Sequence, residues 1–116
     1  MPGLIDTHVH LMMSALETNE AIIAQVTSES EPQLLARIEA NAKAALRAGL
    51  TTIRDCGGTK THVQQIRDRI RRGNIPGPDI LACGSPITTT RGHCHWLGLI
   101  ADSYDEVEHA AQRMLA

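Results

Sequence analysis

Apolar residues along this chain recur with two different periods, and the periods alternate. Short runs rich in β-branched and apolar residues at positions 4–9, 50–55 and 79–83 predict strands. Apolar residues at helical spacing predict a helix of about 17 residues after Ser30, a second helix near residues 60–72 and a third that starts near Glu106. The pattern therefore predicts strands and helices that follow one another along the chain.

The remaining segments are less regular, but their ends are marked by cap residues. Ser30 with Gln33 and Ser103 with Glu106 match the capping box that begins a helix. Residues 11–27 carry apolar side chains without a clear period and are expected to form a loop or a short helix. Residues 84–101 are expected to form a long loop.

Strands that alternate with helices imply a parallel sheet with right-handed crossovers. Such a sheet either closes as an eight-unit barrel or stays open as a doubly wound sheet. The first strand leads into His8-Val9-His10 and not into a glycine-rich phosphate turn, which disfavours the open sheet. We predict an α/β fold that comprises the first three βα units of a truncated (β/α)8 barrel, as one partial domain over residues 1–116.

The end of the first predicted strand carries candidate metal ligands. Alternation along a strand would place Asp6, His8 and His10 on one face. Two imidazoles at this spacing can bind one divalent ion such as zinc, and Asp6 could orient one of them as a hydrogen-bond acceptor. A pair of structural histidines is the alternative, whereas His62 and His109 are expected to lie at the surface.

Composition limits the function classes. The chain has 116 residues, a net charge of −2 and an apolar fraction of 42%, as in ordinary globular proteins. This charge gives no electrostatic basis for binding nucleic acid or an anionic membrane. Three cysteines without a close pair, and no secretory or membrane-spanning pattern, lead us to expect a cytoplasmic protein.

Three motifs together resemble the amidohydrolase superfamily, especially its imidazolonepropionase-like and Xaa-Pro dipeptidase-like members. They are the first strand with His8-Val9-His10, the run Gly49-Leu50-Thr51-Thr52-Ile53-Arg54-Asp55, and the loop Gly92-His93-Cys94-His95-Trp96-Leu97-Gly98.

The resemblance implies a hydrolase that cleaves amide or other C–N bonds in peptide-like or cyclic amide substrates, with one or two divalent ions, zinc foremost. It implies that His8 and His10 bind the metal, while the other ligands and the catalytic aspartate of the family come from later strands. We therefore expect this chain to be inactive alone and to pair with the missing part of the barrel or with copies of itself. Arg91 stands where relatives often carry a glycine.

Other roles remain open. His93 and His95 are candidates for substrate binding, or are loop histidines without a role. Arg54 either contacts substrate or pairs with Asp55 to brace the strand end. The alternative functions are a small metal-binding module without catalysis and a barrel scaffold piece that self-associates.

Overall fold

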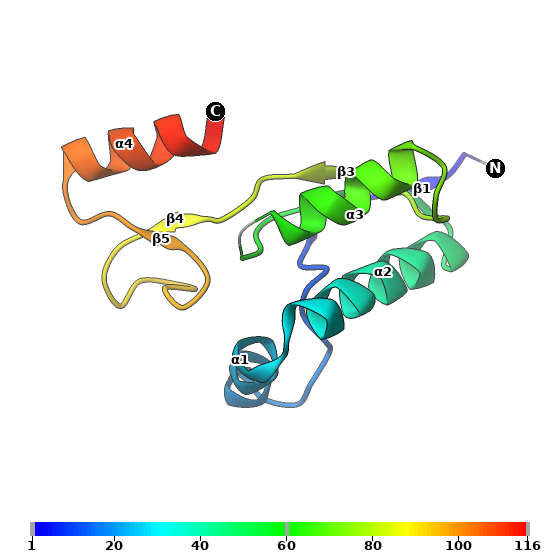
Figure 1. Cartoon of the computed structure of the whole chain (residues 1–116), viewed down its shortest axis with the longest axis horizontal. Coiled ribbons are helices and arrows are strands. Elements are labelled where there is room, and N and C mark those ends of the chain that lie inside the picture. Colours follow the sequence, from blue (N-terminus) through cyan, green and yellow to red (C-terminus); the bar gives the residue numbers. More distant parts are fainter. Residues whose placement is uncertain (1, 60, 116) are drawn as a thin grey trace.

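A three-stranded parallel sheet lies at the centre of the computed structural model, which describes residues 2–59 and 61–115 (Figure 1). The strands are β1 (Leu4–Val9), β2 (Leu50–Asp55) and β3 (Asp79–Ala82), in the order β1–β2–β3. Both pairings are parallel, which confirms the predicted α/β class. Because the strands are parallel, all three carboxyl ends lie at one edge of the sheet, where residues from different units can meet.

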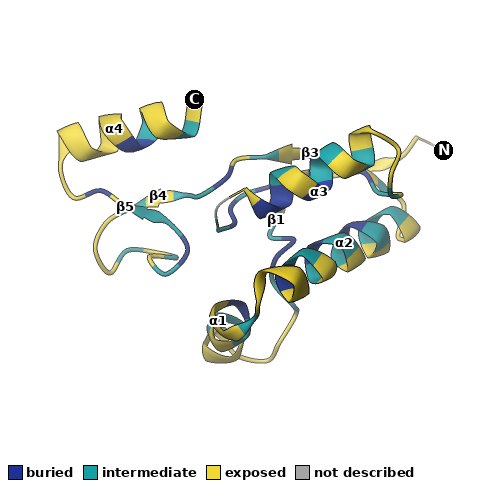
Figure 2. Cartoon of the chain, in the orientation of Figure 1, coloured by how far each residue is buried: buried dark blue, intermediate teal, exposed yellow. Residues whose placement is uncertain are grey.

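Two helices pack against this sheet and against each other. They are α2 (Glu31–Arg47), which has the predicted 17 residues, and α3 (His62–Arg71). At the start of α2, Gln33 Oε1 accepts the backbone N–H of Ser30 at 3.0 Å, as the predicted cap requires. Leu34, Ile38 and Ala42 form a buried stripe along α2, whereas the buried residues of α3 lie in its first half (Figure 2). The core therefore lies between the helices and one face of the sheet.

The other face of the sheet is open. On β2, Ile53 is fully buried while its neighbour Arg54 is exposed, and on β3 Ile80 is buried while Leu81 is exposed. Since successive strand residues point to opposite faces, burial is confined to the helix side. Ile5 on β1 is 67% exposed, so the open face carries uncovered apolar side chains.

The segments that looked irregular in the sequence contain further elements. Residues 11–27 include most of α1 (Asn19–Ser28), and the expected long loop contains two short parallel strands, β4 (Ile87–Thr88) and β5 (Leu99–Ile100). The last helix is α4 (Tyr104–Leu115), which lies on the far side of β4 and β5 from α2 in Figure 1. No helix within residues 2–59 and 61–115 is long and apolar enough to span a membrane.

The expectation that His62 lies at the surface is wrong. Its side chain is buried, and its Nε2 lies 3.2 Å from Glu31 Oε1 while its Nδ1 lies 3.3 Å from Thr59 Oγ1. The polar imidazole is accommodated because both ring nitrogens have partners. The predicted start of this helix at Lys60 lies outside the described residues, whereas His109 is exposed as expected.

One carboxylate holds the β4–β5 loop to the start of α4. Asp102 accepts hydrogen bonds from the backbone N–H of Thr90 at 2.7 Å and from its hydroxyl at 2.5 Å. These two bonds lower the pKa of the Asp102 carboxyl. The predicted capping box follows, with Ser103 Oγ accepting the N–H of Glu106 and Glu106 Oε2 accepting the N–H of Ser103.

Asp102 should therefore contribute to acid sensitivity. A lowered pKa means that the ionised form stabilises the fold above the ordinary aspartate pKa, and that this stability is lost as pH falls through the lowered value. Asp102→Asn should shrink the difference in melting temperature between neutral and strongly acidic pH. Asp105→Asn on the exposed first turn of α4 is the control, and equal pH profiles for wild type and Asp102→Asn would contradict the expectation.

Candidate metal and substrate site

Two imidazoles lie side by side at the carboxyl end of β1. The ring centroids of His8 and His10 are 5.4 Å apart, and the rings meet edge to face at an interplanar angle of 69°. The simple alternation predicted for this strand does not hold, because the pairing with β2 shifts register between Asp6, opposite Ile53, and Val9, opposite Asp55. Such an irregularity changes the direction of the side chains at the end of the strand. Shifts of this kind are common next to functional sites.

A backbone carbonyl orients the second imidazole. His10 Nδ1 lies 3.1 Å from the carbonyl oxygen of Gly57, in the loop after β2. Since a carbonyl can only accept, Nδ1 carries the proton in this contact, and in the neutral ring Nε2 then keeps its lone pair. Gly57 has φ +147°, and a Cβ there would stand 3.1 Å from Pro86, so glycine suits this close approach. His10 is therefore held in the tautomer that a metal ligand needs.

The buried carboxylate of Asp55 fixes the backbone on both sides of that contact. Its Oδ2 accepts the N–H of Leu11 at 2.8 Å, and its Oδ1 accepts the N–H of Gly57 at 3.1 Å. Burial raises the pKa of Asp55, while the two backbone hydrogen bonds oppose that rise. Asp55 therefore joins the residue that follows His10 to the glycine that contacts the His10 ring.

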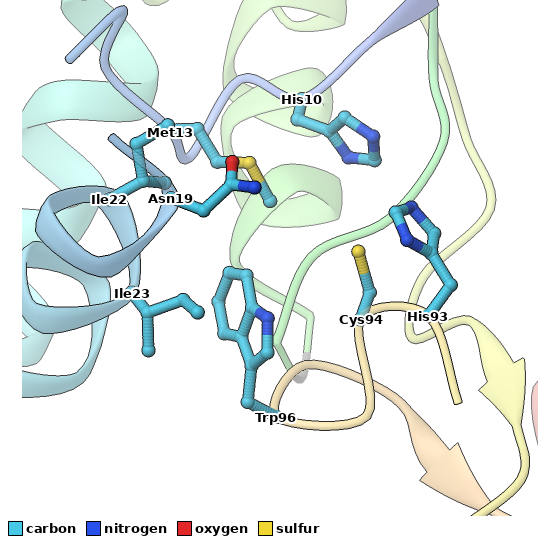
Figure 3. A pocket seen from close by; sticks show the side chains of 8 residues that line it. All are labelled: His10, Met13, Asn19, Ile22, Ile23, His93, Cys94 and Trp96. Atoms are coloured by element: carbon cyan, nitrogen blue, oxygen red, sulfur yellow. The ribbon is translucent and has the colours of Figure 1, made fainter. Parts of the chain in front are cut away.

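Two adjoining cavities open beside these histidines, with volumes of about 270 and 250 Å³. His10, His93 and Cys94 line both, and His8 and Cys56 line only the second. Figure 3 shows the His93 ring and the Cys94 thiol on the opposite side of the first cavity from Met13 and α1, with the His10 ring at its rim. Thus the structure brings His93 from the third loop to the histidines of the first strand.

The other predicted site residues lie elsewhere or make different contacts. The Asp6 carboxylate accepts the backbone N–H of His8 at 3.0 Å. His95 lines neither cavity, and its Nδ1 lies 3.1 Å from the carbonyl oxygen of Gly92 within its own loop.

The expected ion pair between Arg54 and Asp55 is not formed. Arg54 is exposed and donates through Nε and Nη2 to Cys56 Sγ at 3.3 and 3.1 Å, while Asp55 is buried. Neighbouring strand residues point to opposite faces, which is why the two charges do not meet. Asp55 still braces the strand end, but through backbone amides.

Sequence reasoning missed one wall of the first cavity. Asn19, Ile22 and Ile23 of α1 line it together with Met13 and Trp96. The missed signal was Thr18, whose hydroxyl accepts the N–H of Ala21 and so caps α1.

The described donor groups do not make up a complete metal site. Within residues 2–59 and 61–115, no group of three or more His, Cys, Asp or Glu side chains is arranged to hold a metal ion. His8 and His10 fit two positions of such a site, because they are adjacent and Nε2 of His10 is free to donate its lone pair.

Comparisons with known proteins identify the family and the fold. The sequence model of the amidohydrolase family matches residues 1–116. One solved structure, an amidohydrolase, shares 28% identity at a TM-score of 0.75, over 99% of this chain and 31% of its own. A Xaa-Pro dipeptidase with bound methionine shares 25% identity at a TM-score of 0.76, over 98% of this chain and 30% of its own.

Phenylurea hydrolase B shares 32% identity at a TM-score of 0.57, over 72% of this chain and 18% of its own. This chain thus spans about a third or less of these structures, at most 31%. A comparison with curated proteins found no match.

Removing the Asp55 carboxylate should loosen both the fold and the His10 ring. Asp55→Ala leaves two buried N–H groups without acceptors, which costs about 1–3 kcal/mol for each. We expect a lower free energy of unfolding in urea, and nitrogen NMR of the His10 imidazole should show a larger share of the Nε2–H tautomer. Asp79→Ala, at the exposed start of β3, is the control. An unchanged His10 tautomer in Asp55→Ala would show that the carboxylate does not orient the ring.

Proposed function

Because this chain belongs to the amidohydrolase family, we propose that it forms part of a metal-dependent hydrolase that cleaves amide or other C–N bonds in peptide-like or cyclic amide substrates. The observation that carries the proposal is the pair His8 and His10, with Nδ1 of His10 engaged by Gly57 and both rings beside a cavity that His93 also lines. This arrangement supports a metal position next to a space for a substrate.

The residues of the chain then have distinct roles. His8 and His10 hold a divalent ion, zinc being the one that best suits imidazole ligands in a hydrolase. Such an ion polarises an amide carbonyl as a Lewis acid. His93 donates a hydrogen bond to the substrate from the other side of the cavity, and Gly57 and Asp55 keep the His10 ring in place.

Activity requires more of a barrel than these residues provide. Two histidines leave coordination positions of a zinc ion unfilled, and the chain spans 31% of the amidohydrolase structure that it resembles. We propose that further barrel strands, from the same polypeptide or another one, supply the remaining ligands and the proton-transferring carboxylate. The uncovered side chains of Ile5 and Leu81, 67% and 52% exposed, support such pairing.

Metal binding tests the proposal directly. The full chain should bind Zn²⁺ in calorimetric titration, and His8→Ala or His10→Ala should weaken binding by at least about tenfold, since each removes one ligand. His109→Ala on the exposed face of α4 is the matched control and should bind Zn²⁺ like the wild type. Equal Zn²⁺ affinity in all four proteins would refute the metal site.

Self-association tests the open face. Light scattering should show particles larger than one chain at high protein concentration, because apolar strand residues are uncovered. Leu81→Lys, at an exposed position of β3, should shift the chain toward the monomer. A wild-type chain that stays monomeric at high concentration would count against pairing between copies.

A further inference from the structure

The cavity of about 270 Å³ beside His10 is lined mostly by apolar side chains. Figure 3 shows Asn19 beside Met13 and Ile22 on the α1 side, His10 and His93 across from them, and Ile23 and Trp96 at the end away from His10. A cavity with one apolar wall and a few polar groups is the usual form of a site for a small organic molecule.

The apolar side chains that line the cavity are only partly covered by the rest of the protein. Met13, Ile22, Ile23 and Trp96 are each half-buried, so part of their surface remains open to a ligand. Covering apolar surface gains about 25 cal/mol per Å². An apolar group that enters the cavity would therefore be stabilised by a surface that the chain itself leaves uncovered.

The cavity offers no charged side chain as a partner. Among the described residues that line it there is no Asp, Glu, Lys or Arg. Away from an ion held by His8 and His10, a carboxylate or ammonium group that entered would lose hydration without gaining a charged partner, which is costly. The lining therefore favours an uncharged apolar group over a charged one.

We propose that this cavity is the subsite for one uncharged apolar side chain of the substrate, with Asn19 hydrogen-bonding the adjacent amide. The inference rests on the proposed function, which places the reacting bond near His10. The volume of about 270 Å³ lies just below the range of about 300–1,000 Å³ found for ligand pockets, which suits one side chain and its amide. The substrate class is therefore an amide or short peptide with a branched aliphatic or aromatic side chain.

The single tryptophan of the chain reports on this subsite, because Trp96 lines the cavity. The probes are N-acetyl-leucinamide and two near-isosteric compounds, N-acetyl-asparagine amide and N-acetyl-aspartic acid α-amide. The leucine compound should change the Trp96 emission in a saturable manner and bind the full chain at least about tenfold more tightly than either polar compound. Equal affinity for the three amides would overturn the proposal.

Variants locate the effect. Ile23→Asp should abolish the response to N-acetyl-leucinamide, and Ile23→Ala should weaken it even if the aspartate variant fails to fold. Ile100→Asp, at an exposed position of β5 that does not line the cavity, is the matched control and should respond like the wild type. A response lost equally in Ile100→Asp and Ile23→Ala would overturn the assignment of the subsite.

The subsite and the proposed function can fail independently. Leucine-selective, saturable binding of N-acetyl-leucinamide, together with a Zn²⁺ affinity that is the same in wild type, His8→Ala and His10→Ala, supports the subsite and counts against the proposed metal-dependent function. Zn²⁺ binding that depends on His8 and His10, together with equal affinity for the three amides, supports the proposed function and overturns the subsite.

Discussion

A single buried carboxylate holds together the part of this structure on which the candidate site depends. Asp55 ends β2 and accepts backbone N–H groups from Leu11, after β1, and from Gly57, in its own loop. Burying a carboxylate is costly, and two amide donors offset part of that cost. The consequence is local order at the carboxyl edge of the sheet, where loops would otherwise be free to move. The orientation of His10 follows from that order.

The two faces of the sheet differ in burial. Helices α2 and α3 cover one face and bury Ile53 and Ile80, whereas the opposite face keeps Arg54 and Leu81 exposed. In a closed barrel, that opposite face would be the interior. In such a unit, helices cover one face of the sheet and leave the other open. The candidate functional residues and the exposed apolar residues therefore both lie away from α2 and α3.

Much of this fold could be predicted from periodicity, and the reasons for the exceptions are local. The helix after Ser30 has a clear apolar stripe and a capping box, and the strand at residues 50–55 is a β-branched run; both were predicted closely. β4 and β5 are two residues each, too short for any pattern to show. The burial of His62 was missed because one of its partners, Glu31, is 31 positions away in the sequence, and no local pattern reveals such a contact.

The site could be predicted only in part for a similar reason. His8 and His10 are two positions apart in the sequence, so their proximity could be expected without knowledge of the tertiary structure. The contact of His10 with Gly57 and the arrival of His93 at the same cavity depend on tertiary structure. Residues 1–116 match the family model throughout, yet the wall formed by α1 has no sequence motif among those that suggested the family.

Backbone conformation in the third loop has a consequence for how this protein can change through mutation. Arg91 and Cys94 have φ of 60° and 55°, the left-handed region that glycine occupies without steric cost. At most positions of a folded chain glycine is a damaging replacement, whereas at these two it relieves strain and β-branched residues would be the harshest. Glycine should therefore be accepted more readily at Arg91 than at most positions of this loop, while at Cys94 the relief of backbone strain is offset by the loss of a side chain that packs against the core.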